Sequence, residues 1–213
     1  MGVTQAAGLS LKWFRDNFCG AEKDTAALMD VDEYYLMDKE AETVPIGAER
    51  LLYLPYLMGE RTPHLDPDAR GVFFGLSAMH TKKHMLRAVM EGVAYSLRDC
   101  VEVFREMGIN VSDMMACGGG GTSPLWRSML ADLYGCEVKT PASKEGPALG
   151  AALLASVGAG IYGSVPEAVK AVVRTDKVCQ PDSSRMERYD EFYSLYREIY
   201  PALKDSFSRL ATL

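Results

Sequence analysis

Four consecutive glycines lie within the stretch ACGGGGTSPLW at Ala116–Trp126, and they are the first candidates for a ligand-binding site. A glycine-rich turn that leaves a strand and opens a helix lets the backbone approach a phosphate closely, and the helix start offers free N–H donors. Ser123 is a good helix N-cap, and Pro124 is favoured in a first helical turn. The stretch is therefore compatible with a phosphate or nucleotide site, and equally with a tight strand-to-helix turn that binds nothing.

Two common nucleotide motifs are absent. The sequence has no G-x-x-x-x-G-K-[ST] segment, which excludes a P-loop, and Ser123 takes the place of the third glycine of a G-x-G-x-x-G fingerprint, so a Rossmann dehydrogenase fits poorly. The three histidines, His64, His80 and His84, share no metal-ligand spacing, and the five cysteines form no C-x-x-C pair. We expect no metal site, and surface or capping roles for the histidines.

Composition limits the class of protein. The 213 residues suffice for one domain with a substantial core, and the net charge of -6 argues against a broad nucleic-acid or membrane surface. No apolar run approaches the ~20 residues that a membrane-spanning helix needs, and the first residues do not form a signal peptide. We expect a cytoplasmic protein with reduced cysteines, no nucleic-acid partner and no membrane partner.

The elements around the glycines alternate between helix and strand. We expect short helices at Leu9–Phe18 and Asp30–Lys39, an irregular strand at Leu51–Met58, which contains a proline, and a long helix at His80–Met107. A strand at Ile109–Cys117 then rises into the glycines.

After the glycines we expect a helix at Ser123–Tyr134, a strand at CEVKT, and a helix of small residues within EGPALGAALLASVGAG. The final helix, Arg185–Leu210, carries an aromatic stripe that we attribute to packing, and Pro201 should kink it. This order predicts a layered α/β domain.

The block GERTPHLDPDARGVFFGLSAMHTKKHMLRAVMEGVAYSLRD resembles the second signature of the FGGY carbohydrate kinases. Three further blocks agree with it in order: AGLSLKWFRD, GGGGTSPLWRSMLADLYG and EGPALGAALLA. The end, YREIYPAL, is most similar to the xylulokinase group of the family. The residues at the family spacing are Gly71, Phe73, Gly75, Leu76, His84, Ala88, Glu91 and Gly92.

The resemblance implies a ribonuclease H-like, actin-like ATPase domain, with a mixed sheet flanked by helices and an additional C-terminal helix. It also implies that residues 1–213 are the C-terminal, nucleotide-binding half of a two-domain sugar kinase. ATP would lie in the cleft between the halves with Mg²⁺ bound through its phosphates. By position, Gly118, Gly119, Gly120 and Ser123 would contact the nucleotide from one side, and Gly8 and Lys12 from the other. Glycerol kinases carry Gln in place of Lys12 and Asn in place of Ser123.

The motifs of the first half of such kinases, among them a D-x-G-T phosphate turn and a D-x-x-x-Q segment, are absent from the sequence. We therefore expect the general base outside this chain and a fragment that is inactive alone. Asp66, Asp68 and Arg70 fit loop turns better than a catalytic set, and Glu91 fits a structural carboxylate. Glu145 could cap the following helix or approach the nucleotide.

Three functions remain open from the sequence. The first is a kinase that makes xylulose 5-phosphate, and the second is a kinase for gluconate, ribulose, fuculose or glycerol. The third is a separate actin-like nucleotide-binding or assembly module. Each implies ATP or ADP as a ligand, the kinases add a small sugar, and a homodimer is compatible with all three.

Overall fold

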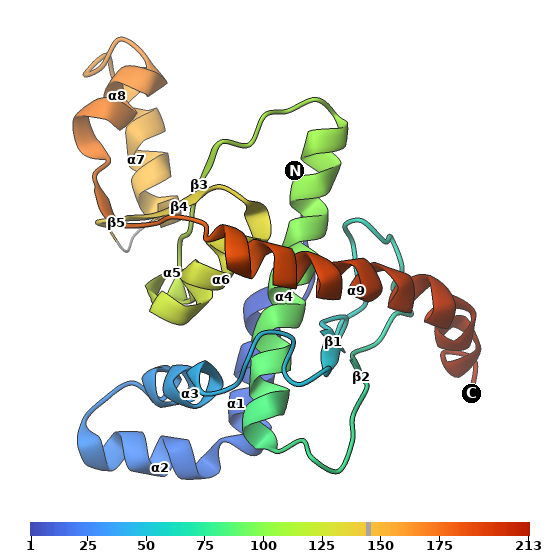
Figure 1. The fold of residues 1–213 in the computed structure, drawn as a ribbon. Helices are drawn as coiled ribbons and strands as arrows, with labels where there is room; N and C mark the ends of the chain where they lie inside the picture. Colours follow the sequence, from blue (N-terminus) through green and yellow to red (C-terminus); the bar gives the residue numbers. More distant parts are fainter. Residues whose placement is uncertain (144–145) are drawn as a thin grey trace.

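The computed structural model describes residues 1–143 and 146–213, and it is a mixed α/β structure (Figure 1). Within this part of the chain, β1 and β2 form an antiparallel pair, whereas β4 lies between β3 and β5, parallel to β3 and antiparallel to β5. Among the described strands, β3 has a neighbour on one side only. In chain order the elements are α1 (Ala7–Phe18), α2 (Gly20–Met29), α3 (Glu33–Glu42), β1 (Leu52–Leu54), β2 (Val72–Phe74), α4 (Lys82–Glu106), β3 (Asp113–Met115), α5 (Gly119–Thr122), α6 (Pro124–Tyr134), β4 (Glu137–Pro141), α7 (Gly146–Gly158), α8 (Val165–Val172), β5 (Thr175–Cys179) and α9 (Ser183–Leu210).

The long helix α4 is the centre of the packing, with α1, α3, α6 and β1 in contact with it (Figure 1). Its apolar residues Leu86, Met90 and Val93 recur at helical spacing and are at most 1% exposed. Gly92 lets β1 approach closely, because a Cβ atom there would lie 2.1 Å from the carbonyl oxygen of Tyr53. The backbones of α4 and β1 are thus in direct contact at this position.

A buried ion pair within α4 ties three segments together. The Nε atom of Arg87 donates to Glu91 over 2.7 Å, and both side chains are almost fully buried. Glu91 also accepts from the backbone N–H of Gly47 at 3.0 Å, and Arg87 donates to the hydroxyl of Tyr189 in α9 at 2.9 Å. The expectation that Glu91 is a structural carboxylate is confirmed.

The aromatic stripe of α9 is a packing surface, as predicted. Tyr189, Tyr193 and Tyr196 are buried, and their rings lie against that of Tyr95 in α4. Pro201 lies inside the helix, and the C-terminal part of α9 turns away from the line of its first part (Figure 1).

Asp99 in α4 makes stability depend on pH. Its carboxylate is 6% exposed and accepts from the Tyr193 hydroxyl at 2.6 Å, and burial raises the pKa of Asp99 to about 6. Since this pKa exceeds the unfolded value, the folded state holds the proton more tightly. The contribution of Asp99 to stability is full below pH ~4 and is lost as the pH rises through 6.

We therefore expect the free energy of unfolding of the wild type to fall by about 2 kcal/mol, relative to that of Asp99→Asn, as the pH rises from 4 to 7. Urea unfolding at several pH values measures this difference. Asp190→Asn is the control, because Asp190 is an exposed carboxylate on the same pair of helices. Parallel stability curves for the wild type and Asp99→Asn would contradict the prediction.

The sequence-based boundaries differ from the structure in the first third of the chain. The helix expected at Asp30–Lys39 is wrong at its start, because Asp30 adopts a left-handed conformation (φ 53°) that ends α2. Helix α3 begins after Asp32, whose side chain caps it by accepting from the N–H of Tyr34. Five elements of the structure were not predicted from the sequence, namely α2, β2, α5, α8 and β5.

Candidate nucleotide site

The glycine turn between β3 and α6 has the predicted local geometry. Gly118 has a φ of 75°, which favours glycine, and the side chain of Ser123 accepts from the N–H of Trp126 at 3.0 Å. Pro124 is in the first turn of α6. The guanidinium of Arg127 donates to the carbonyl oxygens of Gly121 and Thr122 and so fixes the turn from behind. The N-capping role expected of Ser123 is confirmed.

The start of α1 lies opposite this turn, and no side chain caps it. Its N-cap position is Ala6, which cannot accept a hydrogen bond through its side chain, and the first turn contains no acidic residue. Gly8 has no heavy atom within 4 Å of the position of a Cβ atom. Free N–H groups and open space at a helix start favour an anionic ligand.

Between α1, α3 and the glycine turn lies a cavity of about 480 Å³, which we call the acidic cavity. Its volume is in the range of small-molecule sites. Four of the six predicted nucleotide residues line it, namely Gly8, Gly119, Gly120 and Ser123. Other lining residues are Leu11, Asp32, Tyr34, Tyr35, Asp38, Thr122, Pro124 and Trp126.

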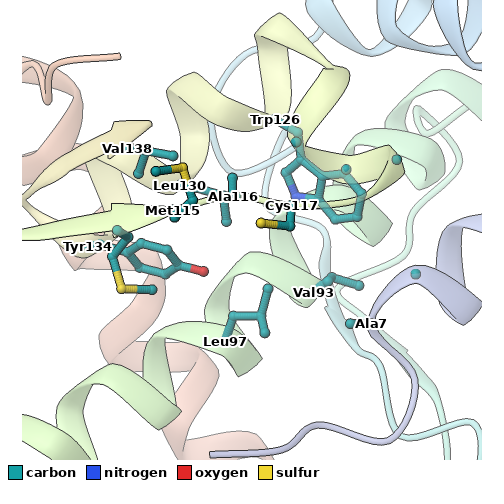
Figure 2. A pocket seen from close by; sticks show the side chains of 15 residues that line it. Ala7, Val93, Leu97, Met115, Ala116, Cys117, Trp126, Leu130, Tyr134 and Val138 are labelled. Carbon is teal, nitrogen blue, oxygen red and sulfur yellow. The ribbon is translucent and has the colours of Figure 1, made fainter. Parts of the chain in front are cut away.

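A second cavity of about 380 Å³, the apolar cavity, adjoins the first and shares Gly8, Gly119, Gly120 and Trp126 with it. Figure 2 shows its wall, in which Val93 and Leu97 of α4 face the segment Met115–Cys117. The hydroxyl of Tyr134 points into this space (Figure 2). The indole Nε1 of Trp126 is buried and has no hydrogen-bond partner among the described residues.

A third cavity, of about 440 Å³, lies on the β4–β5 side of the glycine turn. It contains Gly118, which lines neither of the other two cavities, together with the cationic residues Arg127 and Lys177. Gly119 lines all three cavities. The glycine turn is thus the common wall of the site.

Lys12 lies apart from the other predicted residues. Its ammonium group donates to Asp16 one turn further along α1 at 2.6 Å, and this bond lowers the pKa of the Asp16 carboxyl. Lys12 is not among the residues that line the three cavities. Its assignment to the nucleotide stays a prediction.

The sequence analysis missed Asp38, which α3 brings to the acidic cavity. Burial raises the pKa of Asp38, and a hydrogen bond with Ser123 opposes that rise. No motif surrounds Asp38, and its place in the site depends on α3 and the start of α6 lining one cavity, which the sequence does not reveal. Tyr35 and Trp126 were missed in the same way.

The charged loop after β1 has the turn role that was expected. Asp66 accepts from the backbone N–H groups of Asp68 and Ala69, and also from the hydroxyl of Tyr200. Arg70 donates to the carbonyl oxygens of Pro67 and Ala69. These contacts, most of them within the loop and one from α9, account for Asp66 and Arg70 without a ligand.

The histidines fill three structural roles. His84 forms a capping box with Thr81 at the start of α4, and His80 accepts from the N–H of Ser77. The expectation of a surface or capping role is wrong for His64, which is half-buried and stacks on Tyr200 with ring centroids 3.8 Å apart. Residues 1–143 and 146–213 contain no group of His, Cys, Asp and Glu side chains suited to a metal ion. Glu145 lies outside the described residues.

The chain is similar in sequence to known carbohydrate kinases. The chain is 40% identical over 205 residues to the xylulose kinase of Bacillus subtilis (strain 168), covering 96% of this chain and 39% of that protein. It is 36% identical over 211 residues to the gluconokinase of Bacillus licheniformis, covering 99% of this chain and 41% of that protein. The chain thus spans about two fifths of the length of these relatives.

Solved structures agree with the sequence relatives. The ligand-bound xylulose kinase from Lactobacillus acidophilus superimposes with a TM-score of 0.85 at 29% identity, covering 97% of this chain and 40% of that one. The xylulose kinase from Rhodospirillum rubrum gives 0.83 at 33% identity. These matches confirm the expected α/β ATPase fold. No described helix is both long and apolar enough to cross a membrane.

The match to a family covers most of the chain, including α1, the glycine turn and all of α7. Residues 1–159 match the C-terminal domain of the FGGY family of carbohydrate kinases. The chain therefore belongs to the FGGY family of carbohydrate kinases.

Proposed function

We propose that this chain is the nucleotide-binding half of a carbohydrate kinase that transfers the γ-phosphoryl group of ATP to a hydroxyl group of D-xylulose. The observation that carries the proposal is the meeting of Gly8, Gly119, Gly120 and Ser123 around one cavity. The xylulose kinases among the relatives support this sugar. The gluconokinase of Bacillus licheniformis supports gluconate as the second candidate.

The residues present fit an adenine nucleotide. The uncapped N–H groups of α1 and the glycine turn can donate to phosphate oxygens, and the space beside Gly8 and Gly119 is open where side chains would otherwise block a ligand. Ser123 and Gly120 would lie against the adenosine, with Gly118 nearer the phosphates and Lys12 at the outer side. Phosphoryl transfer depends mostly on such positioning and on charge neutralisation.

Mg²⁺ would be bound through the phosphates of ATP and would neutralise their charge during transfer. We assign no general base to residues 1–213, and we propose that the base and the sugar contacts come from another part of the kinase. We further propose a cytoplasmic enzyme, with ATP or ADP and a small sugar as its ligands, and without a nucleic-acid or membrane partner.

The purified 213-residue chain should bind ADP weakly and should show no D-xylulose-dependent turnover of ATP. Titration calorimetry measures the binding, and a coupled assay for ADP release measures the turnover. The B. subtilis xylulose kinase serves as the positive control for the assay. Sugar-dependent turnover by the chain alone would refute the placement of the general base, and undetectable ADP binding would refute the nucleotide site.

A further inference from the structure

Asp38 is an acidic side chain in the wall of the proposed nucleotide site. It lies in α3 and lines the acidic cavity together with Asp32. The carboxylate of Asp32 is engaged in capping α3, since it accepts from the N–H of Tyr34 at 2.7 Å. Burial raises the pKa of the Asp38 carboxyl, Ser123 in the same cavity wall opposes that rise, and the two oxygens of a carboxylate offer about four acceptor positions.

Charge determines which end of a nucleotide can lie beside Asp38. A carboxylate repels phosphate, so we expect the phosphates beside the uncapped start of α1 and the backbone of Gly119 rather than beside Asp38. The wall beside Asp38 is apolar and aromatic, with Leu11, Tyr35 and Trp126. Such a wall suits the flat face of a base, while a carboxylate can only accept hydrogen bonds from the edge of that base.

We propose that Asp38 accepts a hydrogen bond from the 6-amino group of adenine and thereby selects the base of the nucleotide. This inference rests on the proposed function. Ser123 lies in the wall of the same cavity, where its hydroxyl oxygen accepts from the N–H of Trp126 at 3.0 Å. A base with hydrogen at C6 offers no donor there and leaves the carboxylate unpaired, which weakens binding.

The test compares ADP with purine riboside 5′-diphosphate, which differs from ADP only in lacking the 6-amino group. For the wild-type chain we expect ADP to bind at least about 10-fold more tightly in titration calorimetry, as one hydrogen bond to a charged group implies. In Asp38→Leu the two ligands should bind equally. In Asp38→Asn the preference for ADP should persist, because the amide oxygen can still accept.

Asp32→Asn is the matched control, since it removes the other carboxylate of the acidic cavity and should leave the preference unchanged. Equal affinity of the wild type for the two ligands, or a preference that persists in Asp38→Leu, would overturn the inference and leave the nucleotide site intact. If neither ligand binds the wild type, the proposed function fails and the inference fails with it. Circular dichroism of each variant confirms that it is folded.

Discussion

Glu91→Ala should lower the free energy of unfolding by about 3–5 kcal/mol, the usual cost of removing one partner of a buried ion pair. The variant leaves the Arg87 guanidinium, whose side chain is 6% exposed, without its counter-charge. It also leaves the N–H of Gly47 without the acceptor that it has in the wild type. Because whole domains are stable by only ~5–15 kcal/mol, a large part of the total would be lost. Urea unfolding followed by circular dichroism measures it.

Two further variants separate charge from packing at this pair. Glu91→Gln retains an oxygen that can accept from Gly47 and should cost less than Glu91→Ala. The double variant Arg87→Met, Glu91→Leu removes both charges and should recover much of the loss, because it leaves no unpaired ion in the core. A cost below about 1 kcal/mol for Glu91→Ala would show that the pair does not hold the three segments together.

Gly119→Val should weaken ADP binding by at least about 30-fold, or ~2 kcal/mol, while leaving folding almost unchanged. Gly119 lines all three cavities, and a Cβ atom at this position would have no heavy atom within 4 Å. The added methyl groups therefore enter the space proposed for the nucleotide rather than the core. Titration calorimetry gives the affinity, and thermal unfolding gives the stability.

Gly158→Val is the matched control, because Gly158 at the end of α7 is equally free of neighbours and is absent from the walls of these cavities. Gly8→Ala adds a single methyl group on the opposite wall and should weaken binding less, by about 5-fold, or ~1 kcal/mol. If Gly119→Val binds ADP as the wild type does, the nucleotide does not pass along the glycine turn.

The conformation of the glycine turn could be predicted from local signals in the sequence. Ser123 and Pro124 act within the first turn of α6, and Gly118 acts through its own backbone angle, so their roles can be read from a few neighbouring residues. The same holds for the periodic apolar residues of α4 and for the aromatic stripe of α9. These elements were predicted within a few residues.

Contacts between distant segments could not be predicted in this way. Asp38 reaches the site because α3 and the start of α6 line the same cavity, and Glu91 accepts from the backbone N–H of Gly47. Neither the place of Asp38 in the cavity wall nor the contact of Glu91 with Gly47 is indicated by residue spacing or residue type. Asp30 shows a related limit, since aspartate is common both at helix starts and in left-handed turns, and the structure uses it to end α2.

The open side of β3 affects how the isolated chain behaves at high concentration. Asp113 and Met115 bracket a strand of three residues with a described neighbour on one side only, and the apolar cavity adjoins it. Unpaired strand edges are places where a second polypeptide can add and start aggregation, and short length and charge oppose this. The shortness of β3 opposes such addition, whereas the carboxylate of Asp113 is already paired with Lys139 of β4 at 3.1 Å and adds little charge to the edge. We therefore expect the isolated chain to be handled best in dilute solution.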